Sequence, residues 1–405
     1  MKFIIHTQYY PPEIGAPQAR LSELSERLVA YGHDVTVITA MPNYPTGRIY
    51  KGYKGLFKSE EINGVKVIRT WIYPTKSIRF LPRLTNYFSF VFSSFFLGAA
   101  LLPKADYLLT ESPPLFLGIS GFLLSRIKKA RWIFNVSDLW PESAVRLGII
   151  GKGLPLRISE YLEAFCYRKA WLVTGQSREI LEGVKQRVPD TRTYHLTNGV
   201  DSSRFTPELY STSLHKELGE GAECVAIYAG LHGIAQGLDQ IIEAARELQD
   251  LSGKLKIILV GDGPEKESLL QKAKKLRNIK FLDPKPREII PKLLASSDIA
   301  IVPLKMHIPG AVPSKIYEAM ACALPVILVA KGEAEQIVRE SGAGITILPG
   351  RVNDLAHALR QLTLDYDLRR TFGEQGRQAV LVKYDRNLIV SNFVNFLAEQ
   401  RYANL

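Results

Sequence analysis

The chain opens with residues 1–39, MKFIIHTQYYPPEIGAPQARLSELSERLVAYGHDVTVIT. Lys2–Thr7 has the apolar composition of a strand, and Pro17–Tyr31 carries leucines at helical spacing. Gly32 ends that helix, and Asp34–Thr39 is again strand-like. A strand, a helix and a second strand in this order predict a parallel sheet with helices packed on it.

The alternation of apolar strands and amphipathic helices continues to the end of the chain. An Asn-Gly turn at Asn198-Gly199 and the polar stretch to about Glu223 predict a boundary followed by a linker. We therefore predict an α/β protein of two Rossmann-like, doubly wound parallel-sheet domains, residues 1–199 and 200–384, facing a central cleft. A final helix at about 385–405 could pack back on the first domain. The further strands expected are Lys66–Trp71, Asp106–Thr110, Trp132–Val136, Trp171–Thr174, Cys224–Tyr228, Lys256–Val260, Ile279–Leu282, Ile299–Val302 and Val326–Val329.

Composition excludes several classes of protein. The chain has 405 residues, of which 46% are hydrophobic and 23% charged, so it is long and apolar enough for two folded cores rather than wholesale disorder. Its three cysteines are far apart, which excludes a disulfide scaffold and fits a reducing compartment. Met1-Lys2 leads straight into a strand without a signal-peptide pattern, so we expect a cytoplasmic location.

Positive charge is concentrated in the first half of the chain. Residues 1–200 hold 26 Lys and Arg against 15 Asp and Glu, whereas residues 201–405 hold 26 against 25. This asymmetry indicates that the first half meets something anionic, such as a membrane or a phosphorylated substrate. No zinc-finger or RNP-type motif is present, so nucleic acid is not an expected partner.

A long uncharged segment lies at residues 84–103 and is rich in phenylalanine. Its length could span a bilayer, but a span would separate strands of one sheet, so we do not expect one. Two readings stay open: a helix buried in the protein, or a helix lying in the membrane interface with Lys76, Arg79 and Arg83 on anionic headgroups. The excess of positive charge favours the interfacial reading.

Two stretches of the first domain are candidates for ligand contact. The turn after the first strand contains Gly15, which permits close backbone approach, and the helix that follows could hold a phosphate at its amino end. Past a later strand, Asp138 and Glu142 could position or deprotonate a hydroxyl, and Trp140 could stack on a sugar. The alternatives are an ordinary turn, a buried tryptophan, and an acid that only offsets a helix dipole.

In the second domain the strongest candidate is Pro313-Ser314-Lys315 with Glu318 one turn further on. Ser314 is expected to cap a helix, which places Lys315 in the first turn, where a cation opposes the helix dipole. A bound phosphate would reverse that effect, and Glu318 could accept hydrogen bonds from ribose hydroxyls. The alternative is a solvated Lys–Glu pair. Glycine turns at 230–237 and 261–263 could also let the backbone approach a diphosphate.

Other chemistry lacks support in the sequence. The seven histidines are scattered, with no HExxH pattern or cluster at metal-ligand spacing, and GxGxxG, GxSxG and P-loop motifs are absent. We therefore expect no bound metal and no resident cofactor.

These motifs together resemble the retaining glycosyltransferases of family 4, which have the GT-B fold. The stretches that carry the resemblance are Tyr10-Pro11-Pro12-Glu13-Ile14-Gly15, Asp138-Leu139-Trp140-Pro141-Glu142-Ser143, Asn198-Gly199-Val200-Asp201, Tyr228-Ala229-Gly230, Val260-Gly261-Asp262-Gly263-Pro264 and Pro313-Ser314-Lys315 with Glu318. The sequences of these motifs are most similar to those of bacterial O-antigen, capsule and exopolysaccharide transferases, including the fucosamine-transferase type. The chain departs from the family at Gly310, where a glutamate is common, and at His232 and Gln236, near which Arg and Lys are common.

The resemblance implies that the second domain binds a nucleotide-diphosphate sugar and the first binds the acceptor, without a metal. It implies catalytic roles for Asp138, Lys315 and Glu318. The donor residues implied are Gly15, Gly230, His232, Gln236, Gly261, Gly263, Arg287, Ser314, Lys315 and Glu318, and the acceptor residues are Glu13, Asp138, Trp140 and Glu142.

The function expected is transfer of a sugar, N-acetylated or 6-deoxy, from a UDP-linked donor to a lipid-linked saccharide acceptor, at the inner face of the plasma membrane. UDP and GDP are not distinguished by the sequence. The alternative is a UDP-sugar epimerase of the same fold, which needs no acceptor. A non-catalytic sugar-binding protein and a peripheral membrane scaffold are further alternatives.

Overall fold

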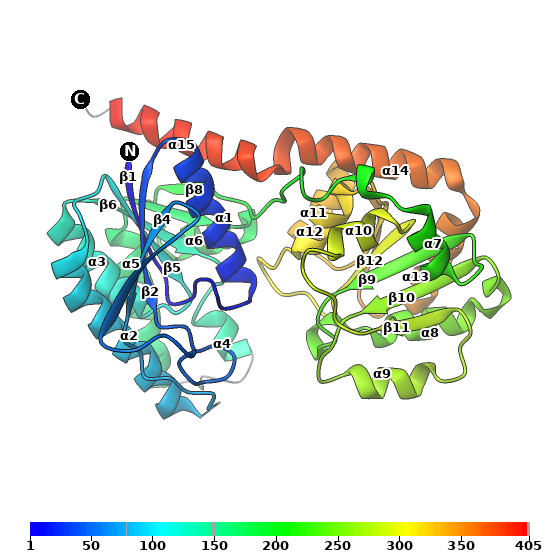
Figure 1. Ribbon diagram of the computed structural model, residues 1–405, viewed down its shortest axis with the longest axis horizontal. Coiled ribbons are helices and arrows are strands. Elements are labelled where there is room, and N and C mark those ends of the chain that lie inside the picture. The colour runs from blue at the N-terminus through cyan, green and yellow to red at the C-terminus, as the bar shows by residue number, and fades with distance from the viewer. Residues whose placement is uncertain (78, 147–150, 152, 403–405) are drawn as a thin grey trace. The chain divides into compact units, whose positions relative to one another are not determined.

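The computed structural model describes residues 1–77, 79–146, 151 and 153–402. The chain divides into two compact units, which are described separately (Figure 1). Unit 1 is Met1–Thr197 with Val390–Leu405, and unit 2 is Asn198–Ile389.

The described part of unit 1 holds an eight-stranded sheet in the order β3-β4-β2-β1-β5-β6-β7-β8. All neighbouring strands are parallel except β3 and β4, which form an antiparallel hairpin at one edge. The strands are β1 Lys2–His6, β2 Asp34–Ala40, β3 Phe57–Ile62, β4 Val65–Thr70, β5 Tyr107–Ser112, β6 Arg131–Val136, β7 Leu172–Gly175 and β8 Thr193–His195. The helices are α1 Ala16–Ala30, α2 Phe80–Leu101, α3 Leu117–Lys128, α4 Glu142–Arg146, α5 Leu154–Lys169, α6 Arg178–Arg187 and α15 Arg386–Tyr402.

Helices cover both faces of this sheet because its central strands are apolar on both sides. Side chains of α3, α5 and α6 join one core with Ile4, Leu108 and Phe134. The C-terminal helix α15 lies against unit 1: the Tyr107 hydroxyl donates a hydrogen bond to the Leu397 carbonyl at 2.9 Å, and the Phe393 ring lies 5.2 Å from that of Tyr194. Residues 403–405 of the predicted C-terminal helix lie outside the described residues.

The described part of unit 2 holds a six-stranded, wholly parallel sheet in the order β11-β10-β9-β12-β13-β14. One core joins the sheet to α10, α11 and α12, and a second core joins the opposite face to α8, α9 and α13. The strands are β9 Cys224–Ala229, β10 Leu255–Val260, β11 Ile279–Leu282, β12 Ile299–Pro303, β13 Val326–Val329 and β14 Gly344–Ile347. The helices are α7 Thr212–Gly219, α8 Asp239–Glu247, α9 Lys266–Ala273, α10 Ile290–Ala295, α11 Ser314–Ala321, α12 Glu333–Glu340, α13 Val352–Leu364 and α14 Tyr366–Ala379.

Two expectations about local structure are wrong. The polar stretch predicted as a linker up to Glu223 contains α7, which Ser211 caps by accepting a hydrogen bond from the Leu214 amide. Strands β3, β8 and β14 were not predicted, because each is short or polar and lies at a sheet edge or next to one.

Helix α2 has Asn86 and Ser94 buried together with Phe90, whereas two other phenylalanines of the helix are exposed. Asn86 donates to the Tyr73 carbonyl at 2.6 Å, and the Ser89 hydroxyl accepts from the Tyr73 amide at 2.8 Å. Phe92 and Phe96 are 58% and 66% exposed. The segment is therefore only partly buried in the protein: Phe90 and Val91 belong to a core with Met41, whereas 28% of the most apolar window of α2, which is long and apolar enough to cross a membrane, is buried. Strands β4 and β5, which precede and follow α2, belong to one sheet.

Candidate functional site

The carboxyl ends of β9, β10 and β12 lie at one edge of the parallel sheet of unit 2 and bring two glycine-containing loops together. The Gly230 amide donates to the Val260 carbonyl at 2.9 Å, and the His232 amide donates to the Asp262 carbonyl at 2.8 Å. The loops after β9 and β10 are thus joined backbone to backbone.

Glycine is required where these loops meet. Gly261 has a φ of +143°, and a Cβ placed on it would lie 1.9 Å from the Gly230 carbonyl oxygen. Gly263 has a φ of +156°, and its Cβ would lie 2.4 Å from the His232 carbonyl oxygen. Side chains at either position would force the loops apart.

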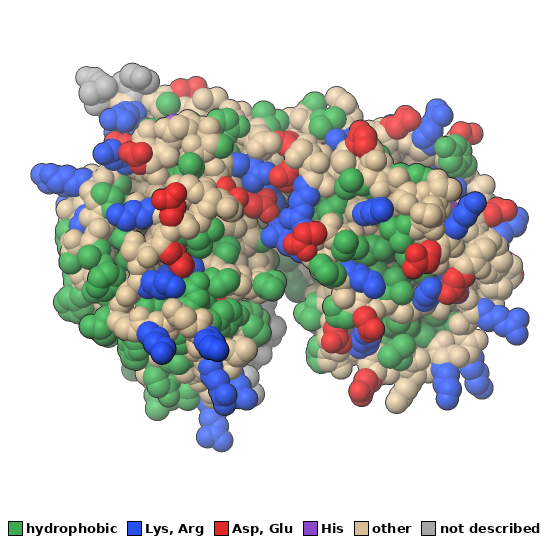
Figure 2. Space-filling model, in the orientation of Figure 1, with side chains coloured by type: hydrophobic (Ala, Val, Ile, Leu, Met, Phe, Trp, Pro, Cys, Tyr) green, Lys and Arg blue, Asp and Glu red, His purple; other side chains and the backbone are tan. Residues whose placement is uncertain are grey.

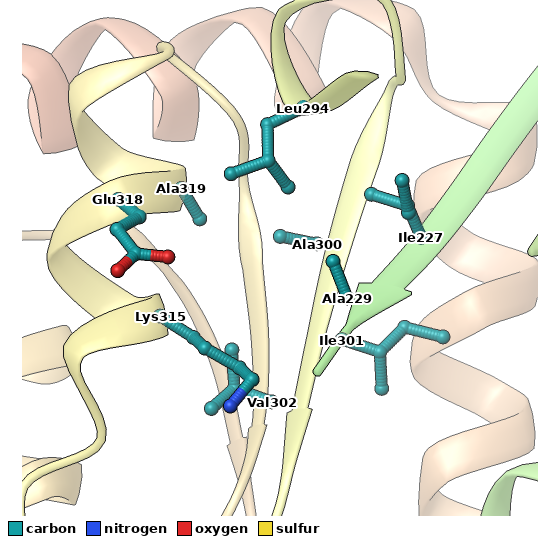
Figure 3. Close-up of a pocket in the computed structure, with 9 residues that line it drawn as sticks. All are labelled: Ile227, Ala229, Leu294, Ala300, Ile301, Val302, Lys315, Glu318 and Ala319. Carbon is teal, nitrogen blue, oxygen red and sulfur yellow. The ribbon is translucent and has the colours of Figure 1, made fainter. Parts of the chain in front are cut away.

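Lys315 lies in the first turn of α11 and points to this loop pair. A small pocket is lined by apolar side chains of β9 and β12, by Leu294 of α10, and by Lys315 and Glu318 of α11 (Figure 3). The Lys315 ammonium lies 5.5 Å from the centroid of the Tyr228 ring, and within the described residues it has no ion pair. Burial lowers the pKa of Lys315, and Glu318 only partly opposes that shift. The cation is therefore held where its charge lacks full compensation.

Glu318 is one turn beyond Lys315, and both side chains project from α11 on the pocket side (Figure 3). The Ser314 hydroxyl donates to Glu318 Oε1 at 3.1 Å. Ser314 is therefore not the N-cap that the sequence predicted: Pro313 occupies the cap position, and the serine hydroxyl orients the glutamate instead. Across the residues described here, no hydrogen bond is made to Glu318 Oε2.

His232 is fully buried under the two loops, and neither of its ring nitrogens has a hydrogen-bond partner among the described residues. Its ring lies 6.1 Å from those of Tyr228 and Phe281. Burial and, secondly, the charge of Lys266 lower the pKa of His232, so the ring is neutral. Gln236 Oε1 is also buried without a partner in the described part of the chain, which leaves two polar groups of the loop in need of a ligand or water.

Arg287, which was predicted among the donor residues, belongs to a different loop from the two glycine turns. It lies in the exposed loop between β11 and α10, and its carbonyl accepts a hydrogen bond from the Arg204 guanidinium at 2.7 Å. The structure therefore brings together Gly230, His232, Gly261, Gly263 and Lys315.

In unit 1, Asp138 follows β6 at the carboxyl edge of the sheet. Burial raises its pKa, although hydrogen bonds from the Ser143 side chain and the Leu139 backbone lower it, and the nearby charge of Glu142 raises it further. Trp140 packs edge-on against Phe116, with 5.5 Å between ring centroids. Asp138 and Glu142 are thus close, whereas the tryptophan ring already has an aromatic partner.

Glu13 and Gly15 lie in the turn between β1 and α1. Glu13 Oε1 accepts hydrogen bonds from the backbone amides of Asn43 and Tyr44 at 2.7 and 2.8 Å, so this carboxylate joins two loops of unit 1. Its Oε2 is buried and has no hydrogen-bond partner in the part of the chain that the structure describes, and burial raises its pKa. The Gln18 amide lies over Gly15, 2.4 Å from where a Cβ would stand.

Sequence analysis missed a polar network at the carboxyl ends of β5, β6 and β7. Glu111 is buried and pairs with Arg20 of α1, and its Oε2 accepts a hydrogen bond from Asn135 at 2.6 Å. Arg20 also donates to Ser137 at 2.6 Å and to Gln176 at 2.8 Å. The available signal was a carboxylate directly after an apolar strand, at the edge where such sheets bind ligands.

The described residues contain no group of three or more His, Cys, Asp or Glu side chains that could hold a metal ion. The absence of a metal requirement stays an expectation of the sequence. Side-chain ammonium and guanidinium groups and backbone amides are protein groups that can bind a phosphate.

Comparison with known families follows this division of the chain. Residues 15–199 match the model of the glycosyl transferase 4-like domain, and residues 212–379 match the model of glycosyl transferases group 1. With two Rossmann-like parallel-sheet units, these matches define the chain as a glycosyltransferase with the GT-B fold. Neither match supports the epimerase alternative.

Among curated relatives, WcaI of Escherichia coli strain K12, assigned as a colanic acid biosynthesis glycosyl transferase, is 28% identical over 90% of this chain and 92% of its own length. Among solved structures, sucrose-phosphate synthase from Thermosynechococcus elongatus superposes with a TM-score of 0.76 at 19% identity, covering 100% of both chains. Anabaena HepE in complex with UDP superposes with a TM-score of 0.73 at 18% identity, covering 98% of this chain and 100% of that chain.

Replacement of Lys315 by methionine should stabilise unit 2. The folded state lowers the pKa of Lys315, so its charged form is disfavoured on folding at neutral pH, and a neutral side chain of similar length removes that cost. We expect the melting temperature of Lys315→Met to rise by about 2 °C or more at pH 7. The gain should shrink toward about pH 10, because Lys315 of the wild type is then increasingly neutral and its burial no longer costs stability.

The exposed Lys331, replaced in the same way, is the control and should leave the melting temperature unchanged. Thermal unfolding followed by calorimetry over this pH range measures both effects. A lower melting temperature for Lys315→Met would contradict the view that the ammonium lacks compensation in the free protein.

Proposed function

We propose that the protein transfers a sugar, with retention of anomeric configuration, from a nucleotide-diphosphate donor to a lipid-linked saccharide during bacterial surface polysaccharide biosynthesis. The observation that carries this proposal is Lys315: a half-buried ammonium without a carboxylate ion pair in the described residues, at the amino end of α11 and against the Gly230 loop. Such a position suits an anionic diphosphate, which supplies the missing negative charge.

The donor proposed is UDP linked to an N-acetylated or 6-deoxy sugar. HepE, which is similar in fold, was solved with UDP, and WcaI is assigned to colanic acid biosynthesis, which supports a nucleotide-sugar donor and a polysaccharide product. The sequence of the Pro-Ser-Lys motif resembles that of family 4 transferases of the fucosamine type. This resemblance supports retention of anomeric configuration and this choice of sugar. No metal is assigned to the reaction.

Each residue of the site then has a chemical role. Lys315 and the first amides of α11 stabilise the charge that develops on the leaving diphosphate, which is the largest electrostatic demand of the reaction. Glu318 accepts hydrogen bonds from the ribose, while Ser314 holds its other oxygen. Asp138 orients the acceptor hydroxyl, and the leaving phosphate takes up the proton as the new bond forms on the same face of the sugar.

The remaining residues predicted at the site border the substrates. The loops that carry Gly230, Gly261 and Gly263 approach the diphosphate with their backbones, and His232 and Gln236 offer buried polar atoms beside them. Arg287 belongs to this donor set by resemblance alone. In unit 1 we assign Gly15 to the sugar and phosphate, and Glu13, Trp140 and Glu142 to the acceptor region.

The unit 1 surface over α2, α3 and α5 is proposed to contact an anionic membrane, which places the enzyme at the inner face of the plasma membrane. Its exposed apolar side chains are Phe92 and Phe96 of α2, Leu123 and Ile127 of α3, and Leu154, Ile158 and Tyr161 of α5. Hydrophobic side chains gather along the left edge of unit 1, where Figure 1 places α2 and α3 (Figure 2).

Charge favours a lipid surface over a protein partner here. Lys76 and Arg79 are exposed just before α2, and residues 1–200 carry eleven more basic than acidic side chains, the difference between 26 and 15. Apolar side chains for the interface and cations for anionic headgroups are the two signals that reversible membrane binding requires. A lipid-linked acceptor would then be reached without leaving the membrane surface.

A transfer assay tests the reaction. Purified protein is incubated with radiolabelled UDP-N-acetyl sugars or UDP-6-deoxy sugars and an extract of bacterial lipid-linked saccharides. Label should enter the organic phase only when donor and extract are both present, and the new linkage should have the anomeric configuration of the donor by NMR. Lys315→Ala should reduce the rate by about 100-fold or more, because it removes charge stabilisation of the leaving group. An unchanged rate for this variant would remove the central phosphate contact.

The role of Glu318 is tested by comparing UDP with 2′-deoxy-UDP. If the carboxylate accepts a hydrogen bond from the ribose, wild type should bind UDP about 10-fold more tightly than 2′-deoxy-UDP. In Glu318→Gln the two affinities should become nearly equal, because a neutral amide is a weaker acceptor for the ribose 2′-hydroxyl that distinguishes the two ligands. Isothermal titration calorimetry measures both affinities, with the exposed Glu340→Gln as control. The same preference for UDP in Glu318→Gln would place the ribose elsewhere.

Membrane contact is tested by sedimentation with vesicles of phosphatidylglycerol and phosphatidylcholine. Replacement of both Phe92 and Phe96 by serine should weaken binding at least about 10-fold, since two large apolar side chains no longer leave water. Added salt should weaken binding further. Leu270→Ser with Leu364→Ser, which changes two exposed leucines of unit 2, is the matched control and should bind as wild type does. Vesicle binding that changes neither with salt nor with the two phenylalanine substitutions would contradict the proposal that this surface contacts the membrane.

A further inference from the structure

Tyr228 lies beneath Lys315 at the end of β9. Its side chain is 1% exposed and belongs to the core between the sheet and α8, α9 and α13. The Tyr228 hydroxyl donates to the Leu231 carbonyl at 2.7 Å, and the Lys315 ammonium stands 5.5 Å from the ring centroid. The ring is therefore fixed from below and faces the cation from the core side.

The contact between Lys315 and Tyr228 requires glycine at position 230, because a larger residue would collide with the lysine side chain. A Cβ on Gly230 would lie 2.4 Å from Lys315 Cε and 3.2 Å from the Tyr228 hydroxyl oxygen. Its φ of +154° is also one that other residues rarely adopt. The aliphatic part of Lys315 thus crosses the loop directly over Gly230.

We propose that Tyr228 is a positioning residue that holds the Lys315 ammonium toward the diphosphate of the donor. This inference rests on the proposed function. A carboxylate in the place of the ring would fix the lysine equally well, but it would neutralise the charge and repel an incoming diphosphate. The face of an aromatic ring attracts an ammonium and leaves its net charge intact. Tyr228 therefore orients the cation and keeps it available for an anion.

Two substitutions distinguish positioning of Lys315 from a purely structural role of Tyr228, because the hydroxyl and the ring make different contacts. The hydroxyl closes the loop through Leu231, whereas the ring faces the cation. Tyr228→Phe keeps the ring and removes the hydroxyl. Tyr228→Leu removes both and leaves an apolar side chain in the core.

The test is a double-mutant cycle read by calorimetric titration of UDP, with uridine as a ligand that lacks phosphate. Tyr228→Phe and Tyr228→Leu are each made in wild type and in Lys315→Ala. Tyr228→Leu should weaken UDP binding about 3- to 30-fold in wild type, and less than about twofold when Lys315 is already absent. Tyr228→Phe should restore UDP binding to near that of wild type, and uridine should bind every variant alike.

The outcomes separate the two proposals. If Lys315→Ala binds UDP as wild type does, the phosphate contact of the proposed function fails, and this inference fails with it. If Lys315→Ala weakens binding but Tyr228→Leu causes the same loss in both backgrounds, only the positioning role is overturned. An equal loss for Tyr228→Phe would likewise assign the effect to the hydroxyl and the loop.

A second variant keeps the test decisive if Tyr228→Leu does not fold. Gly230→Ala places a methyl group against Lys315 Cε and should displace the ammonium from the ring. Its loss of UDP affinity should be several-fold smaller in Lys315→Ala, where no side chain remains to be displaced. An equal loss in both backgrounds would show that the glycine serves only the loop, and would contradict positioning of Lys315 at this place.

Discussion

The candidate site of unit 2 depends on the Lys315 ammonium, which lies at the amino end of a helix, where a cation is disfavoured. Lys315 is in the first turn of α11, where the helix dipole disfavours a cation, and burial disfavours it again by lowering its pKa. Neither cost is offset by an ion pair within the described residues. Such a group at the ligand edge of a parallel sheet is a candidate for binding an anion, and the loops around it limit the shape of that ligand.

The parallel sheet explains why those loops converge. In unit 2 every strand runs in one direction, so the segments after β9, β10 and β12 leave the sheet at the same edge as α11 begins. Gly261 and Gly263 allow two of these segments to touch through their backbones, and Gly230 lets the lysine pass above them. Amides, a buried imidazole and an ammonium are thereby concentrated at one edge of the sheet.

Much of this could be predicted from the sequence, because buried strands of parallel sheets are continuous apolar runs bounded by glycine turns. Ile279–Leu282 and Val326–Val329 were predicted to the residue. The edge strand β3, FKSEEI, was missed since its four central residues are polar or charged and it has no buried run. The pairing of Lys315 with Tyr228 could not be predicted either, because it depends on two strand-to-helix connections meeting in space. For the same reason the network of Glu111 and Arg20 was not recognised.

Helix α2 illustrates a harder limit of pattern reading. Asn86, Ser89 and Ser93 lie on one stripe of the helix, and a polar stripe normally faces water. Here the chain leaving β4 has unpaired backbone groups at Tyr73, and Asn86 and Ser89 satisfy them. These hydrogen bonds turn Asn86 and Ser89 toward the chain that they cover, while Phe92 and Phe96 on the same helix are exposed. The orientation of an amphipathic helix thus follows the backbone it covers, and an outward apolar face is the consequence that a membrane surface can use.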